Sequence, residues 1–458
     1  MAVEHELVHE DQNSTNDDDT TIRTGTLWTT IAHIITAVIG SGVLSLAWST
    51  AQLGWIGGPI ALISFAFVTY VSSILMSDCY RSPDPVTGTR NRSFTDAVRV
   101  ILGEKKAWGC GLIQYVSFYG TAIAYVVTTA TCIKAIRKSN CYHKEGRGAN
   151  CEYGGNVYML LFGVVQIVMS QIPDFHSLVM VSIVATIMSF CYASVGFGLG
   201  FVQVIENGKI AGSITGVPNS SVAKKLWHTF QALGDIAFAY PYTFILLEIQ
   251  DTIKSPPENK VTKQASAIAI IVTSVFYLGC GCFGYAAFGN NTPGNLLTGF
   301  GFYEPYWIVD FANVCIIVHL IGGYQLFSQP IFAFAERSLT EKFPESRFLK
   351  NFYGIKLPML PVFQLNLFRL CFRTAYVVST TAIALVFPYF NEILGVLGAL
   401  NLWPLAIYFP VEMYIVQRKV EVWSTKWVVL EMFSFVLMVV SVVALVGSVA
   451  GLIEAKMS

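Results

Sequence analysis

Apolar residues gather in long runs along this chain rather than alternating with polar ones. The runs have about 18 to 30 residues, which as helices would cross a hydrocarbon core of ~30 Å, whereas strands of a barrel would be half that length. The pattern therefore predicts an all-α polytopic membrane protein with eleven transmembrane helices. We expect these helices at approximately 27–53, 55–80, 108–133, 156–173, 177–205, 226–248, 264–289, 306–335, 368–388, 392–414 and 427–453.

The first residues, 1–24, differ from the rest because they are polar and acidic. They contain no basic stretch followed by an apolar core and a cleavage site, so we expect no cleaved signal peptide. This segment has too few apolar residues to offset the entropy of ordering. We therefore predict a disordered acidic cytosolic tail at 1–24 and a transmembrane domain at 25–458.

Charge sets the expected orientation. Apolar residues make up 54% of the chain and charged residues 13%, and the net charge is zero, so a lipid bilayer is the expected partner and nucleic acid is not. Placing the N-terminus in the cytosol puts about twenty of the 29 Lys and Arg on the inner side, which agrees with the positive-inside rule. An odd number of crossings then leaves the C-terminus extracellular.

Two of the predicted helices contain breaks near the middle of the membrane. The first contains Ile39-Gly40-Ser41-Gly42, and the sixth contains Ala239-Tyr240-Pro241-Tyr242. Unwound backbone at this depth has to be buried in protein or line a polar cavity. Taken singly, each break has an ordinary alternative, since Gly-x-Gly also marks close helix packing and proline kinks are frequent in membrane helices.

The positions of the breaks divide the chain into two halves. One repeat runs over about 27–205 and the other over about 226–414, each opening with an interrupted helix, and an extra helix follows at about 427–453. This is the layout of inverted-repeat transporters. There, the N-terminus of a half-helix presents free N–H groups to an anionic group such as a carboxylate.

Ionisable side chains inside the predicted spans are the candidates for proton coupling. His33, Asp235 and His319 lie where lipid excludes charge, and such groups normally face the bundle interior or a water path. Histidine changes charge near the pH of many extracellular spaces. The alternative role is that of a structural, hydrogen-bonded histidine. No sequence motif of a hydrolase, metalloprotease or phosphate-binding loop is present, so we expect no enzyme, no metal site and no cofactor.

Two further features fall in predicted outer loops. Cys141 and Cys151 both lie in the loop 134–155, which faces an oxidising compartment in this orientation, so we predict a disulfide between them. Two free loop cysteines are the alternative. Asn219 and Asn290 begin glycosylation sequons, although Pro293 weakens the second.

From residue 25 onward, the chain resembles the plant amino acid permeases, which are proton-coupled members of the amino acid/auxin permease group. Long and well-ordered motifs carry this resemblance: Ala32–Thr36, Ile39–Trp48, Ser170–Pro173, Gly234–Phe238, Gly284–Gly289, His319–Gln325, Gln329–Pro330, Trp403–Pro404 and Tyr408–Met413. It departs from the family at Pro241, where a small residue is common.

The resemblance implies a LeuT-like core of ten helices with one extra helix, a plasma-membrane location, and cotransport of L-amino acids with protons. Neutral amino acids are the expected substrates, and acidic amino acids, auxin and other organic acids stay open. The family's two histidines correspond to His33 and His319. A proton-independent uniporter or exchanger, or an amino acid sensor with little transport, is the alternative function.

These inferences give a substrate site at the two breaks. We expect the amino acid carboxylate to bind the freed amides of the first break, and the ammonium to meet carbonyls and side chains of the sixth helix. The expected site residues are Ile39, Gly40, Ser41, Gly42, Val43, Phe238, Ala239, Tyr240 and Tyr242, with His33, His319 and Asp235 coupling the proton.

Overall fold

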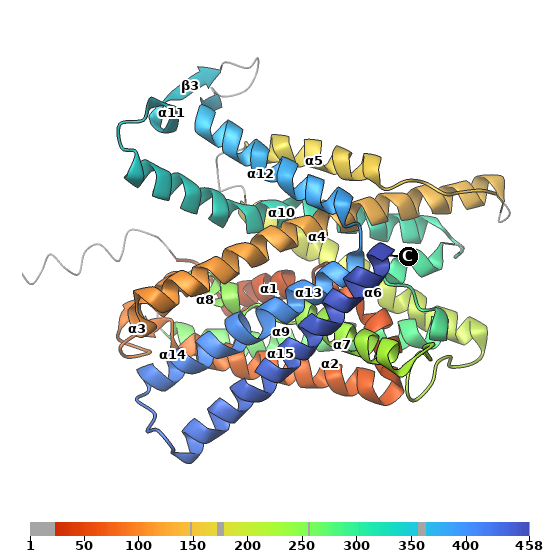
Figure 1. Cartoon of the computed structure of the whole chain (residues 1–458), viewed down its shortest axis with the longest axis horizontal. Coiled ribbons are helices and arrows are strands. Elements are labelled where there is room, and N and C mark those ends of the chain that lie inside the picture. Colours follow the sequence, from red (N-terminus) through yellow and green to blue (C-terminus); the bar gives the residue numbers. More distant parts are fainter. Residues whose placement is uncertain are drawn as a thin grey trace, which may run out of the picture.

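The computed structural model describes residues 23–146, 149–171, 178–254, 257–301, 303–355 and 363–457. Most of the predicted tail, 1–22, and part of one quoted motif, 172–173, lie outside these residues. The described chain is a bundle of helices with two short β-hairpins, β1–β2 and β3–β4, both antiparallel (Figure 1).

The elements follow one another along the chain with these bounds: α1 Leu27–Val38, η1 Ser41–Leu44, α2 Leu46–Asp78, β1 Arg81–Ser82, β2 Thr89–Arg90, α3 Phe94–Leu102, α4 Glu104–Glu145, α5 Asn156–Ser170, α6 Leu178–Asn207, α7 Val222–Ala239, η3 Thr243–Ile245, α8 Leu246–Gln250, α9 Glu258–Phe288, η4 Gly289–Asn291, η5 Leu296–Phe300, α10 Trp307–Lys342, α11 Arg347–Lys350, β3 Phe352–Ile355, β4 Phe363–Asn366, α12 Leu367–Val386, α13 Phe390–Trp403, η6 Pro404–Tyr408, α14 Phe409–Gln417 and α15 Thr425–Met457.

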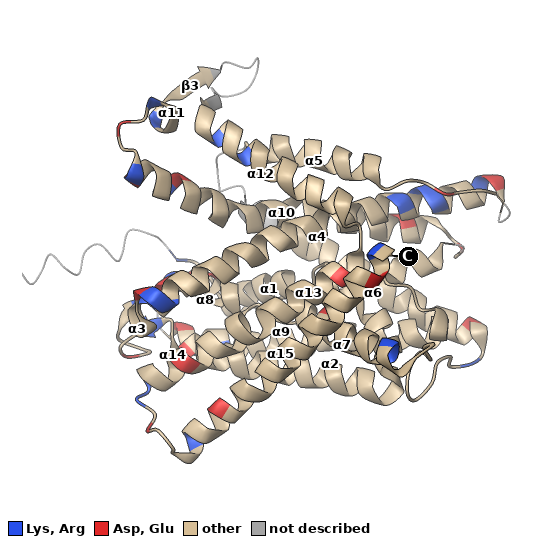
Figure 2. Ribbon diagram, viewed as in Figure 1, with Lys and Arg blue, Asp and Glu red and all other residues tan. Residues whose placement is uncertain are grey.

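The helices have the length and composition of membrane spans. Among the described residues, nine helices are long and apolar enough to cross a bilayer, and α1 and α5 are shorter apolar helices. Every predicted span falls on helix in the structure. Charged residues gather mostly toward the ends of the long helices and leave their middle parts apolar (Figure 2). The chain is therefore a multi-pass helical membrane protein.

Within α2, the chain turns back on itself at Gly54. This residue has φ 78° and ψ 179°, which is outside helical geometry and strained for any side chain. A Cβ on Gly58 would lie 3.0 Å from the Cα of Thr50, whereas eight residues of straight helix would separate these positions by about 12 Å. The ends of the predicted spans 27–53 and 55–80 thus meet at a tight turn.

One predicted loop is partly helical. The sequence placed a loop at 134–155. In the structure, α4 continues past the apolar run without interruption to Glu145, and Gly146 caps it. Gly146 has φ 90°, a conformation that favours glycine and ends the helix. The C-terminal end of α4 therefore extends past the predicted apolar span.

Helices α7 and α13 pack with their backbones almost in contact. A Cβ on Gly398 would collide with the carbonyl oxygen of Gly234 and the amide nitrogen of Phe238. One turn earlier on α13, a Cβ on Gly395 would lie 3.1 Å from Oδ1 of Asp235. Because these glycines have no side chain, α13 supports α7 directly along the stretch that leads into its break.

The segment before α1 is fastened to the start of α9. Arg23 forms an ion pair with Glu258 at 2.9 Å, and Arg81 contacts the same carboxylate at 2.7 Å. Gly25 donates its amide hydrogen to Thr252 O at 2.9 Å and accepts from the amide of Lys254. Arg23, which the sequence assigned to the tail, is thus part of the folded structure.

Candidate substrate site at two helix breaks

The first break separates α1 from α2. Helix α1 ends at Val38, Ile39 leaves helical geometry with φ −78° and ψ 80°, and Gly40 is extended with φ −109° and ψ −155°. The short 3₁₀ helix η1 then leads into α2. Glycine at 40 and 42 lowers the cost of leaving the helix, as the sequence indicated.

The second break follows α7. Helix α7 ends at Ala239, residues Tyr240, Pro241 and Tyr242 lie outside any helix, and the chain resumes as η3 and α8. Proline explains the interruption because it has no N–H to donate and clashes with the preceding turn.

The structure brings the two breaks together. A Cβ on Gly42 would lie 3.0 Å from the Cα of Ala239, 3.1 Å from its Cβ, and 3.2 Å from the ring of Phe238. Ile39, Tyr240 and Tyr242 are each 0% exposed, so this meeting point is enclosed by protein. Residues that are about 200 positions apart in the sequence therefore form one buried site.

Polar donors at the first break have no partner. Among the described residues, neither the amide of Ser41 nor that of Gly42 donates a hydrogen bond, as expected at the start of a helix. The Ser41 hydroxyl, in a residue that is 1% exposed, also lacks a partner. These donors, together with the positive end of the helix dipole, suit a carboxylate.

The carbonyl groups at the breaks, in contrast, accept hydrogen bonds from hydroxyl groups of neighbouring helices. The Tyr277 hydroxyl of α9 lies 2.6 Å from Val38 O and 2.9 Å from Ala239 O, so it bridges both breaks. Ser189 and Tyr192 of α6 each donate to Ile39 O at 2.9 Å. Val38 O also accepts from the Gly40 amide at 2.9 Å, whereas Ile39 O and Ala239 O have no other donor among the described residues.

Tyr125 of α4 faces the least crowded part of the site. A Cβ on Gly40 would meet only one atom within 4 Å, the Tyr125 hydroxyl at 3.9 Å. No hydrogen bond from this hydroxyl is found among the described residues. Sequence reasoning missed Tyr125, since a tyrosine inside an apolar run is indistinguishable from a packing residue.

His319 lies next to the first break. Its Nδ1 is 3.2 Å from Ala185 O and 3.1 Å from the Ser189 hydroxyl. Because a carbonyl only accepts, Nδ1 carries the hydrogen in this arrangement. Ser189 also donates to Ile39 O, so a short chain of contacts connects the His319 ring to the unwound backbone.

The other two proton-coupling candidates lie elsewhere. Asp235 is 0% exposed on α7, where one carboxylate oxygen accepts from Ser49 at 3.3 Å and the other has no partner. Among the described residues, no hydrogen bond or ion pair joins Asp235 to His319. His33 is half-buried on α1, more than one turn before the break. No group of three residues able to hold a metal ion occurs in the part of the chain that the structure describes.

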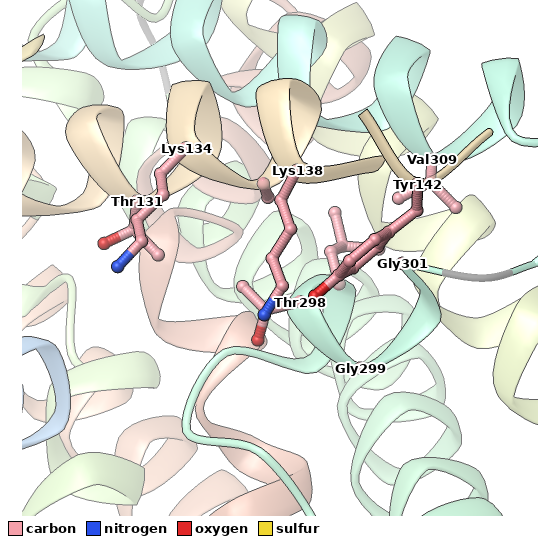
Figure 3. A pocket seen from close by; sticks show the side chains of 10 residues that line it. Thr131, Lys134, Lys138, Tyr142, Thr298, Gly299, Gly301 and Val309 are labelled. Carbon is pink, nitrogen blue, oxygen red and sulfur yellow. The ribbon is translucent and has the colours of Figure 1, made fainter. Parts of the chain in front are cut away.

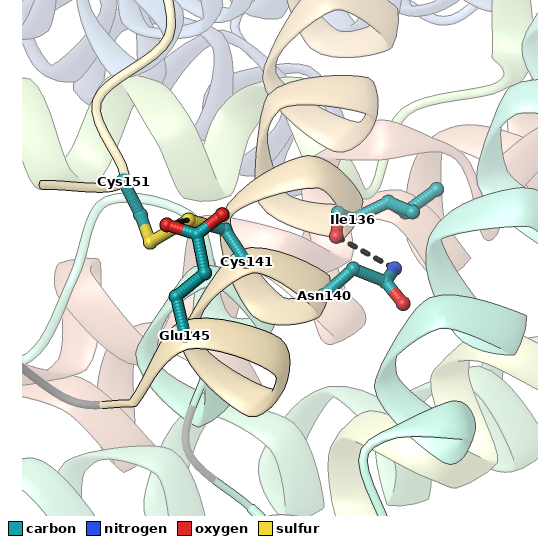
Figure 4. Close-up of a disulfide and its surroundings, with 5 residues drawn as sticks. All are labelled: Ile136, Asn140, Cys141, Glu145 and Cys151. Carbon is teal, nitrogen blue, oxygen red and sulfur yellow. Dashed lines mark hydrogen bonds between the residues drawn. A yellow bond between two sulfur atoms is a disulfide. The ribbon is translucent and has the colours of Figure 1, made fainter. Parts of the chain in front are cut away.

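Near the C-terminal end of α4, the structure joins Cys141 to Cys151 through a disulfide with a Cα–Cα distance of 5.9 Å (Figure 4). The two sequon asparagines are accessible to different degrees: Asn290 is exposed, and Asn219 is half-buried beside Val217.

Buried, interrupted helices that meet inside a multi-pass bundle define a class of membrane protein, the solute transporters. The comparisons identify the family. The family model of the transmembrane amino acid transporter proteins matches residues 23–454, and this chain belongs to that family, among the plant amino acid permeases. It is a family of transporters and not of enzymes.

Relatives from Arabidopsis thaliana align over nearly their full lengths. The chain is 58% identical over 445 residues to "Probable amino acid permease 7", covering 96% of this chain and 95% of that protein. It is 54% identical over 440 residues to "Amino acid permease 2", with 95% and 89% covered. "Lysine histidine transporter-like 6" is 30% identical over 432 residues, with 93% and 89% covered.

Proposed function

We propose that this protein carries L-amino acids together with protons into the cell by alternating access. One observation carries the proposal: two interrupted helices meet in the buried interior and leave the Ser41 and Gly42 amides unpaired. Membership of the amino acid permeases supports an amino acid as the solute.

In this proposal, the substrate carboxylate binds the amides and side chains of Ile39 to Val43. The Tyr125 hydroxyl, 3.9 Å from the Cβ position of Gly40, is an additional donor for the carboxylate. The ammonium group contacts the carbonyl groups and rings of Phe238 to Tyr242, at the negative end of the α7 dipole.

We further propose the LeuT-like arrangement of two inverted repeats, eleven crossings and the plasma membrane as the location. The helix breaks at equivalent places in the two halves support the repeats. The Cys141–Cys151 disulfide supports an extracellular outer end of α4, because disulfides persist in oxidising compartments. This orientation leaves the N-terminus cytosolic and the C-terminus extracellular.

A single proton supplies enough energy for concentrative uptake. A membrane potential of ~100 mV contributes ~2.3 kcal/mol per charge, and one pH unit adds ~1.36 kcal/mol. Together these correspond to roughly 500-fold accumulation of a neutral amino acid. We assign the coupling proton to His319, on the basis of its contact chain to Ile39 O, with His33 and Asp235 as the other candidates.

Electrophysiology in a heterologous cell tests this function. We expect amino acids to evoke an inward current that persists without sodium and grows as the external pH falls. In His319→Gln, the current should lose much of its pH dependence, whereas a role in binding alone would weaken transport equally at every pH. A uniporter would take up amino acids without current, a sensor would bind them with little uptake, and either result would contradict the proposal.

A further inference from the structure

A second polar feature lies at the outer end of α4, away from the helix breaks. A cavity of about 330 Å³ separates the last turns of this helix from the turn η5 between α9 and α10. Thr131, Lys134, Lys138 and Tyr142 line it from α4 at spacings of three and four residues, which places them on one helix face. Thr298 and Gly299 of η5 form the facing wall (Figure 3).

Among the described residues, the two lysines of this cavity have no acidic partner. Neither forms an ion pair or hydrogen bond with them, and the Lys138 ammonium lies over the Tyr142 ring, 5.4 Å from its centroid. Figure 3 shows the Lys138 side chain extending from α4 toward Thr298. Like charges four residues apart on a helix repel each other, and a bound anion would relieve that repulsion.

Carboxylates on the surrounding elements have other contacts. Glu304 lies 3.1 Å from the His143 ring, and Asp310 accepts a hydrogen bond from Asn140 at 2.6 Å. The Glu145 carboxylate lies beside the Cys141 sulfur, which forms the disulfide with Cys151 (Figure 4). None of the three lines the cavity, so the residues that line it carry two positive charges and no negative one.

The hydroxyl groups of the cavity complement the lysines. Thr131 donates its proton to Val127 O at 2.9 Å, and Thr298 donates to Asn295 O at 2.6 Å. Their oxygens therefore act toward a ligand only as acceptors, which suits an ammonium group. The cavity thus combines two cations for carboxylates with acceptors for an amine.

We infer that this cavity binds amino acids with a second carboxylate as they enter the transporter, and that it favours them over neutral and cationic amino acids. This inference rests on the proposed function. The lysines attract the carboxylate of a neutral zwitterion and repel its ammonium group. A dicarboxylic amino acid, in contrast, keeps a net negative charge. The volume lies at the lower end of the ~300–1,000 Å³ range of small-molecule sites, which fits one small solute.

The first test compares uptake kinetics for glutamate, alanine and lysine in cells. Replacing both lysines with Lys134→Gln and Lys138→Gln should raise KM for glutamate roughly tenfold, since a focused positive field raises the local concentration of anions. The maximal rate and KM for alanine should stay within about twofold, and high ionic strength should remove much of the wild-type preference. Lys134→Glu with Lys138→Glu should shift the preference toward lysine.

The control for this test is Lys144→Gln, which removes an exposed lysine of α4 outside the cavity. It should leave all three KM values unchanged. If the double glutamine variant reaches the surface and takes up alanine normally with an unchanged KM for glutamate, the inference is wrong while the proposed function stands. Absence of any amino acid uptake by the wild-type protein would instead contradict the proposed function.

A second measurement does not depend on transport. An amine-reactive acylating reagent is applied to the purified protein, and modification of each lysine is followed by mass spectrometry. Because free amino acids also react with the reagent, the acylation of Lys134 and Lys138 is expressed relative to that of Lys144 in the same sample. Glutamate should lower this ratio, and alanine should lower it much less. Equal protection by chloride or sulfate would show a general anion site, and no protection by glutamate would exclude the site; either result overturns the inference.

Discussion

At the scale of single residues, the two glycines of the first break have different surroundings. Gly42 is pressed against Ala239, with 3.0 Å between the position of a Cβ and the Cα of that residue. Gly40 faces open space toward the Tyr125 hydroxyl, and its φ of −109° is accessible to any residue. The sequence suggested one role for both glycines, whereas the structure separates close packing at Gly42 from open space at Gly40.

Alanine at each position should therefore give different results. Gly42→Ala forces the two breaks apart, and overpacking of this kind costs about 1–3 kcal/mol. We expect it to abolish uptake or raise KM by roughly tenfold or more, the equivalent of ~1.4 kcal/mol. Gly40→Ala should assemble normally and raise KM only a few-fold, because its methyl group enters the space proposed for the substrate. Radiolabelled uptake, normalised to surface protein, measures both effects.

Gly109→Ala is the control for these variants. Gly109 lies in α4, and a Cβ there would meet nothing within 4 Å. Replacing it should leave transport unchanged and stabilise the helix by about 0.5–1 kcal/mol. Normal uptake by Gly42→Ala would show that the breaks do not need this close contact.

At the scale of elements, α9 connects the two interrupted helices through one side chain. The Tyr277 hydroxyl reaches carbonyl groups on both sides, Val38 O and Ala239 O, and its ring packs edge-on against Tyr240 with centroids 4.9 Å apart. A hydroxyl has one proton, so it donates to one carbonyl at a time while the other stays within reach. Helix α9 thus fixes the distance between the breaks.

Tyr277→Phe removes this bridge and keeps the ring. We expect a lower Tm of the purified protein and weaker transport. Val38 O keeps its bond from the Gly40 amide, but Ala239 O loses its donor, and a buried carbonyl left without a partner costs about 1–3 kcal/mol. Tyr240→Phe is the matched control for the Tm, because among the described residues the Tyr240 hydroxyl has only a long contact of 3.5 Å with Ser274. The bridge has no structural importance if Tyr277→Phe keeps the wild-type Tm and KM.

The elements themselves could largely be predicted from the sequence. Long apolar runs predict the spans, and Gly40, Gly42 and Pro241 predict the breaks, because glycine and proline act locally on the backbone. The extension of α4 to Glu145 was missed since polar residues in a helix beyond the membrane resemble a loop. The segment around Arg23 was assigned to the tail because its partner Glu258 is distant in the sequence.

The site was predictable only where backbone chemistry defines it. Tyr125, Ser189, Tyr192 and Tyr277 line or support the breaks, yet tyrosine and serine occur throughout the apolar runs as packing residues. Their roles depend on which helices pack together, and one sequence does not contain that information. His319 was identified because charge is costly in a membrane, but its connection to Ile39 O required the structure.

At the scale of the whole molecule, the proposed alternating access requires movement of the first end of α1, which is cytosolic in the proposed orientation. The structure fastens the segment before that end. Two arginines share the Glu258 carboxylate, whose side chain is 3% exposed, and Gly25 pairs with the backbone around Ile253. In the proposed orientation, this cluster of Arg23, Gly25, Arg81, Ile253 and Glu258 closes the cytosolic side while the helix breaks are buried. We therefore predict that opening toward the cytosol separates Arg23 from Glu258.

Glu258→Gln should shift the protein toward inward-open states. The variant keeps the shape of the side chain but leaves two cations without their carboxylate, and breaking a largely buried pair is strongly destabilising to the state that contains it. A shift of ~1.4 kcal/mol would change the ratio of the two states tenfold. Hydrogen exchange of peptides that cover Gly25 to Ile35 should accelerate, because the Gly25 amide donates to Thr252 O in this structure and should lose that bond when the cluster opens. Apparent affinity for external substrate should fall in proportion to the lost outward-facing population.

Glu304→Gln serves as the control. Glu304 is exposed at the opposite end of the bundle and, among the described residues, pairs only with His143. This variant should leave exchange in the segment from Gly25 to Ile35 unchanged. If the Glu258→Gln peptides exchange at the wild-type rate, the cluster does not hold the inner side closed, and the movement of α1 must be limited elsewhere.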